Sequence, residues 1–172
     1  QLLKDDPNDI QAMFLLAKAR HIREDYSDAA EIFEKVDYIV GNNAEINAGW
    51  GKSLLRNNQF PAAIAKLERA MEIGTSDPFV TVDLADAYMS ISGYQDALSL
   101  LRGSFATLEG NDVTNIGWEV GKRLVCALLK TGGAEEAREV TVQLRDRYGH
   151  YLEIAKEIQI FEDSFKSQIG LK

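Results

Sequence analysis

The chain has 172 residues, of which 45% are hydrophobic and 27% charged, a composition typical of a folded globular protein rather than a disordered one. Its formal net charge of −8 disfavours non-specific binding to nucleic acid or to anionic membranes, because neutralising phosphates requires clustered Lys and Arg. Cys126 is the only cysteine, which excludes an intramolecular disulfide and a cysteine-based zinc site, and no apolar run approaches the roughly 20 residues that span a bilayer.

One phrase of nine residues occurs three times at a fixed interval. The stretches DYSDAAEIF (25–33), QFPAAIAKL (59–67) and GYQDALSLL (93–101) each have an aromatic residue in second place, alanine in fifth and a bulky apolar residue in ninth. Small and large apolar residues recur around them at spacings of three, four and seven, which are helical spacings. Each interval from one phrase to the next therefore predicts two amphipathic helices joined by a short polar turn.

The repeat divides the chain into consecutive segments. Along the chain these are the end of a preceding repeat at 1–9, repeat units at 10–43, 44–77 and 78–111, a looser fourth unit at 112–147, and one more amphipathic helix within 148–172, all in one solenoid domain. The fourth unit aligns through Ala137, whose distance along the chain from Ala97 exceeds the repeat period by six positions, so an insertion is expected near 109–117. Because the chain opens QLLKDD, with neither an initiator Met nor an apolar signal segment, we expect it to be part of a longer protein.

A 34-residue unit of two helices with this placement of large and small residues resembles the tetratricopeptide repeat (TPR). The matching residues are Leu16, Ala17, Tyr26, Ala29, Phe33 and Val36, then Trp50, Gly51, Leu54, Phe60, Ala63, Leu67 and Ala70, then Leu84, Ala85, Tyr88, Tyr94, Ala97 and Leu101. Arg20 and Ser104 depart from the pattern. The resemblance implies an all-α fold, a right-handed superhelix of antiparallel helix pairs with a C-terminal capping helix, and a concave groove lined by the first helix of each pair.

The resemblance also implies which side chains face that groove. The candidate partner-binding residues are Phe14, Lys18, His21, Lys52, Arg56, Phe79, Asp83, Asp86, Met89, Lys122 and Arg123. Lys18, Lys52 and Arg56 are interpreted as a basic patch for an acidic partner segment, whose apolar anchors would bind near the aromatic residues. Ala48 and Gly49 would leave room there for a partner's side chain. Some TPR proteins bind a peptide's C-terminal carboxylate with a Lys/Asn/Arg clamp, but Asp83 at a clamp position predicts that this chain does not.

The last helix is open to two interpretations. Tyr151, Ile154, Ile158, Phe161 and Phe165 alternate steps of three and four and form an apolar stripe. The stripe either caps the fourth repeat, as the end of a solenoid requires, or mediates self-association through Ile154, Ile158, Phe161 and Phe165.

Catalytic signatures are absent from the sequence, which has no GxSxG, HExxH, Walker A or GxGxxG motif. We therefore expect no enzymatic activity, no cofactor and no metal site, and we interpret Cys126 as a small buried or half-buried apolar residue. The sequence predicts a non-catalytic scaffold that binds another protein or peptide, without nucleic acid binding or membrane insertion. The alternative is a homo-oligomerisation module. A cytoplasmic location is expected, and the periplasm is the alternative.

Overall fold

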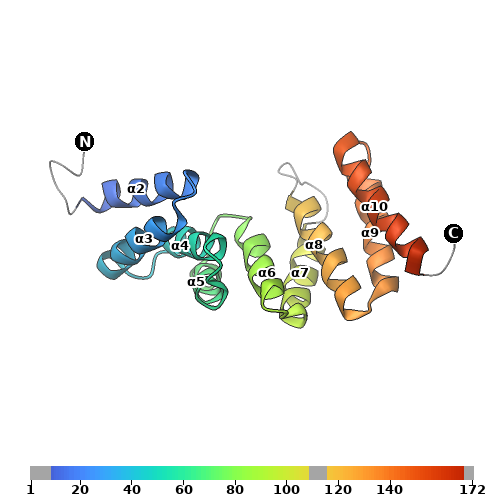
Figure 1. The fold of residues 1–172 in the computed structure, drawn as a ribbon, viewed down its shortest axis with the longest axis horizontal. Coiled ribbons are helices and arrows are strands. Elements are labelled where there is room, and N and C mark those ends of the chain that lie inside the picture. The colour runs from blue at the N-terminus through green and yellow to red at the C-terminus, as the bar shows by residue number, and fades with distance from the viewer. Residues whose placement is uncertain (1–8, 109–115, 169–172) are drawn as a thin grey trace. The chain divides into compact units, whose positions relative to one another are not determined.

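The computed structural model describes residues 9–108 and 116–168, so the predicted segment 1–9 (except Asp9) and most of the predicted insertion lie outside the described residues. Within the described ranges the chain forms helices and no strand (Figure 1). The helices are α2 (Ile10–Ile22), α3 (Tyr26–Val40), α4 (Ala44–Arg56), α5 (Phe60–Ile73), α6 (Val80–Ser90), α7 (Tyr94–Thr107), α8 (Ile116–Thr131), α9 (Ala134–Tyr148) and α10 (Leu152–Gln168).

The helices group into two compact units. Residues 1–91, with α2 to α6, form the first, and residues 92–172, with α7 to α10, form the second. The boundary falls inside the predicted third repeat, between its two helices. The limits of the individual repeats therefore stay predictions, while the helices themselves are observed.

The turn inside each helix pair recurs with the sequence period. Glu24, Asn58 and Ser92 occupy equivalent positions in successive repeats and have positive φ angles of 66°, 58° and 62°. Gly132, with φ 84°, is the equivalent residue in the fourth unit. Its distance along the chain from Ser92 equals that of Ala137 from Ala97, as the predicted six-position insertion requires. In three of these turns the backbone N–H of the following residue donates to the carbonyl five positions back, as from Gly133 to Leu128 at 2.8 Å. In the pairs α2–α3, α4–α5 and α8–α9, whose turns each lie within one unit, this left-handed residue reverses the chain and makes the paired helices antiparallel.

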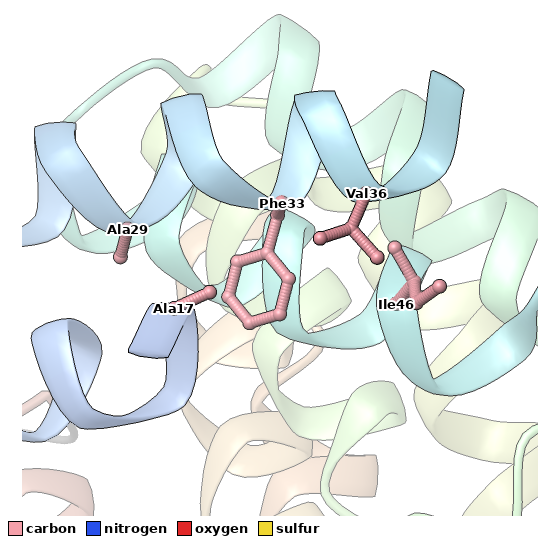
Figure 2. Close-up of a cluster of buried hydrophobic side chains, with 5 residues drawn as sticks. All are labelled: Ala17, Ala29, Phe33, Val36 and Ile46. Atoms are coloured by element: carbon pink, nitrogen blue, oxygen red, sulfur yellow. The ribbon is translucent and has the colours of Figure 1, made fainter. Parts of the chain in front are cut away.

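The core of the first unit is built around Phe33. Its side chain is 1% exposed and packs with Ala17 of α2, Val36 of α3 and Ile46 of α4. Figure 2 shows the ring pointing from α3 toward these neighbours, so that one side chain joins three helices. Burying such a ring stabilises the folded state by roughly 1.5–3 kcal/mol relative to an exposed position.

Small residues at the helix crossings allow this close packing. Ala29, Ala63 and Ala97, the fifth residues of the three phrases, and Ala137, which aligns with them in the fourth unit, are all fully buried. Gly51 lies so close to α5 that a Cβ atom there would be 2.6 Å from Cγ of Leu67. A larger residue at these positions would push the helices apart, and overpacking of this kind costs about 1–3 kcal/mol.

The second unit ends with α10 packed on α9. Ile158 and Phe165 of α10 are 2% and 5% exposed, and the guanidinium of Arg138 in α9 lies 5.7 Å from the centre of the Phe165 ring. An ion pair from Arg145 Nη1 to Glu162 Oε1 at 2.8 Å joins the same two helices. Most of the apolar stripe is thus covered within the chain, as the capping interpretation predicts, while Tyr151 at its start is 49% exposed. No helix in the part of the chain that the structure describes has the length and hydrophobicity to cross a membrane.

Replacing the turn glycine should destabilise the second unit. Gly132→Ala forces a side chain into the left-handed region, so we expect a loss of about 1–2 kcal/mol in the free energy of unfolding, measured by urea denaturation. The matched control is Gly103→Ala in α7, where an added Cβ would meet nothing within 4 Å. That variant should gain about 0.5–1 kcal/mol, because alanine favours a helix interior. Equal effects of the two changes would contradict the role of the turn.

Candidate functional site

A cavity of about 570 Å³ lies between α2, α4 and the turn that joins α5 to α6. All of it belongs to the first unit. Its lining residues are Phe14, Lys18, His21, Ile22, Phe33, Asn43, Ala44, Glu45, Ala48, Gly49, Lys52, Gly74, Thr75, Ser76 and Asp77. The predicted groove residues Phe14, Lys18, His21 and Lys52 are thus brought together around one hollow.

The floor of the cavity is aromatic and apolar. The rings of Phe14 and Phe33 meet edge to face, with centroids 6.0 Å apart and planes at 70°. Gly49 lies directly over Phe33, since a Cβ on it would be 2.5 Å from Cζ of that ring. The equivalent positions one repeat earlier and one repeat later hold Leu15 and Asp83, so neither neighbouring repeat has this opening. Gly49 therefore lets the Phe33 ring reach the backbone of α4, and both residues line the cavity.

The two lysines at the rim are already paired with carboxylates from the next segment of the chain. Lys18 Nζ donates to Glu45 Oε1 at 3.1 Å. Lys52 Nζ donates to Asp77 Oδ2 at 2.5 Å and lies 3.7 Å from Asp83 Oδ2. Within the predicted basic patch, both of these lysines thus have carboxylate partners in the chain itself, which the helical register does not indicate.

Asp83 lies beneath the rim and is only 7% exposed, so it does not offer its side chain to a ligand as predicted. Its second cationic neighbour is Arg56, whose Nη2 donates to Asp83 Oδ1 at 3.4 Å. Burial raises the pKa of the Asp83 carboxyl, and Lys52 and Arg56 offset only part of that rise. The two cations are therefore needed to keep a buried carboxylate ionised, and removing either would leave it poorly compensated.

His21 is held by Ser53 of α4. The Ser53 hydroxyl, which is fully buried, donates to the Gly49 carbonyl at 2.8 Å and lies 3.0 Å from His21 Nδ1. When the Ser53 hydroxyl donates to Gly49, the neutral ring carries its hydrogen on Nδ1 and donates it to Ser53, which leaves Nε2 as an acceptor. Burial, together with the positive charges of Arg56 and Lys52, lowers the pKa of His21. The ring is therefore neutral at pH 7.

A second hollow of about 490 Å³ involves α4, α5 and α6 of the same unit. Predicted groove residues Arg56, Asp86 and Met89 line it together with Leu55, Asn58, Phe60 and Ser90. Phe79 lines neither this hollow nor the larger one and is 39% exposed at the N-terminal end of α6. It was predicted as an apolar pocket residue because its helix was expected to begin earlier.

The basic residues predicted in α8 are also paired. Lys122 Nζ donates to Glu157 Oε2 of α10 at 3.2 Å, and Arg123 Nη1 donates to Glu119 Oε2 at 2.5 Å. The first contact joins α8 to α10, and the second lies within α8, so both cations have carboxylate partners in the chain. Cys126, predicted to be at least half-buried, is exposed.

The stripe of α10 is not available for the predicted self-association. Ile154, Ile158 and Phe165 are buried, and Phe161 is half-buried, in the chain itself. Contact with a second copy through these residues would first require α10 to leave α9. The described residues contain no group of three or more His, Cys, Asp and Glu side chains placed to hold a metal ion.

Comparison with known proteins bears on the fold. The sequence matches no protein-family model and no curated protein. Among solved structures it is similar to YrrB, described as a TPR protein with an unusual peptide-binding site, at a TM-score of 0.73 and 13% identity over 99% of this chain and 83% of YrrB. It is similar to MamA at 0.74 and 20% over 87% and 80% of the two chains. It is also similar to TTC0263, a TPR protein of Thermus thermophilus, at 0.68 and 14% over 92% and 84%.

Lowering the pH should weaken the first unit through His21. The pKa of His21 in the folded chain lies below the unfolded value, so the unfolded chain binds the proton more readily and stability falls as the pH drops from about 6.5 through the folded pKa. His21→Gln should lose less stability than the wild type over that range, measured by urea denaturation at each pH. His150→Gln, which removes the exposed histidine between α9 and α10, is the matched control and should follow the wild type. A His21 variant that parallels the wild type would contradict this account.

Proposed function

We propose that this chain, which has the fold of the TPR proteins, is a non-catalytic scaffold that holds a segment of a partner protein in the cavity between α2 and α4. The observation that carries the proposal is the cavity itself, about 570 Å³ with an aromatic floor of Phe14 and Phe33. Its volume lies within the range of about 300–1,000 Å³ that is usual for ligand sites, and such sites combine apolar walls with a few polar groups. YrrB, a solved structure of the same fold, is described as having a peptide-binding site, which supports this choice of ligand.

The contacts of His21 and Ser53 argue against a catalytic pair at this site. A histidine that activates a serine must accept the hydroxyl proton, whereas here the Ser53 hydroxyl donates to the Gly49 carbonyl. Ser53 is also fully buried and could not reach a substrate. A binding function accounts for the same residues without chemistry. The single cysteine is consistent with work in a reducing compartment such as the cytoplasm.

The binding proposal can be tested with random peptides displayed on phage and selected on the immobilised chain. We expect a selected peptide to bind saturably and to bind Phe14→Ala about tenfold more weakly, because an aromatic anchor at the centre of an interface contributes more than about 1 kcal/mol. Fluorescence polarisation of the labelled peptide measures the change.

Leu15→Ala is the matched control for that experiment. Leu15 is the next residue in α2, is 49% exposed and does not line the cavity, so its replacement should leave the affinity unchanged. Circular dichroism of both variants would verify that α2 still folds. Equal losses for both variants, or the absence of any saturably bound peptide, would overturn the proposal.

Self-association through α10 is the alternative to this scaffold function, and the exposed residues of α10 favour it less. Leu152 and Ile160 are 72% and 68% exposed. A contact of two such residues is small compared with a stable interface, so we expect sedimentation velocity to give a constant monomer mass at all concentrations. A mass that rises with concentration in the wild type, but not in Leu152→Ser/Ile160→Ser, would instead establish self-association.

A further inference from the structure

The rim of the cavity carries no net charge. The charged residues in the lining are Lys18, Lys52, Glu45 and Asp77, two of each sign, and each lysine contacts one of these carboxylates. His21 adds no charge, since its ring is neutral at pH 7. The positive and negative charges around the cavity therefore already compensate one another in the unliganded chain.

This balance disfavours an acidic ligand. A partner carboxylate could reach Lys52 only by competing with Asp77 at 2.5 Å and with the buried Asp83 at 3.7 Å. Displacing either would leave a carboxylate of the chain without its cation, which cancels the gain of the new contact. The pair of Lys18 with Glu45 is half exposed and contributes little in either arrangement.

His21 offers a ligand an uncharged polar group beside the aromatic floor. In the tautomer that donates Nδ1–H to Ser53, while the Ser53 hydroxyl donates to Gly49, Nε2 is free to accept. Nε2 is then a hydrogen-bond acceptor on a side chain that lines the same hollow as Phe14 and Phe33. Such a position favours a ligand group with an apolar body and one hydrogen-bond donor.

We propose that the cavity accepts a tryptophan or tyrosine side chain from a partner segment without net charge, with the ring above Phe14 and Phe33 and its N–H or O–H directed to His21 Nε2. The inference rests on the proposed function and names the ligand that this same site selects. Tryptophan and tyrosine combine a large apolar ring with a single donor and therefore match both features of the hollow. Gly49 is part of this arrangement, because a Cβ at that position would lie 2.5 Å from Cζ of Phe33 and the ring could not keep its place in the floor.

Matched small probes test the two parts of the proposal separately. N-acetyl-tryptophanamide, its acidic counterpart N-acetyl-tryptophan, and N-acetyl-phenylalaninamide would each be titrated into the isotope-labelled chain at about pH 8, where a histidine is neutral. Backbone amide shifts of Ala48, Gly49 and Lys52 report occupancy of the cavity by NMR. We expect the neutral tryptophan probe to bind at least as tightly as the acidic one and about fivefold more tightly than the phenylalanine probe, the usual gain from one hydrogen bond.

His21→Phe supplies the variant for this test. It keeps a ring beside Tyr26, whose centroid lies 5.3 Å from that of His21, but removes the acceptor, so the tryptophan and phenylalanine probes should become equal. Tighter binding of the acidic probe, equal binding of the two neutral probes to the wild type, or an unchanged difference in His21→Phe would each overturn the inference.

The peptide-display experiment, combined with the probe titration, separates the failure of this inference from the failure of the proposed function. Peptides selected by display should contain tryptophan or tyrosine and carry no net charge. If they bind through Phe14 but lack both residues or are acidic, the inference fails and the scaffold function stands. If no peptide binds saturably and no probe shifts the three reporter amides, both fail.

Discussion

The contact between the Phe33 ring and the backbone of Gly49 is the constraint on which the first unit depends. The ring fills the space between α2, α3 and α4, and it fits only because the position facing it has no side chain. The neighbouring repeats carry Leu15 and Asp83 at the equivalent position, so neither of them can form this arrangement. One residue thus sets both the packing of α4 on α3 and the opening above the ring. The fold and the candidate site have a common physical cause.

Ion pairs between successive segments of the chain also connect the helices of the first unit. Lys18 reaches Glu45, Lys52 reaches Asp77, and Arg56 reaches the buried Asp83. Each pair joins one first helix to the helix or turn that begins the next repeat. The contacts of Asp83 matter most among these pairs, because an isolated buried carboxylate is costly and Lys52 and Arg56 compensate it. Residues occupied in this way cannot also serve as an open binding patch.

The sequence predicted the fold well because the fold is local and repeated. Positions 29, 63, 97 and 137 hold alanine, and all four are fully buried. The turn residue with a positive φ angle also recurs once in each repeat, and in the fourth unit it is shifted by the predicted insertion. The site was predicted less well, because register identifies the face of a helix but not the contacts of its long side chains. Lys52 and Arg56 were placed on the correct face, yet their carboxylate partners depend on distances between helices that no period encodes. Phe79 was misplaced for a simpler reason, since α6 begins at Val80.

The charge of the whole chain points to the same class of ligand as the local contacts. A net charge of −8 repels an acidic segment at distances up to a Debye length, about 8 Å at physiological ionic strength. Close to the surface the paired lysines of the rim do not reverse that repulsion, because their own carboxylates lie within 3.1 Å. Attraction must then come from apolar contact with Phe14 and Phe33 and from the one acceptor on His21. An uncharged aromatic anchor uses both of these, whereas the carboxylates of an acidic segment use neither and are repelled by the net charge of the chain within a Debye length.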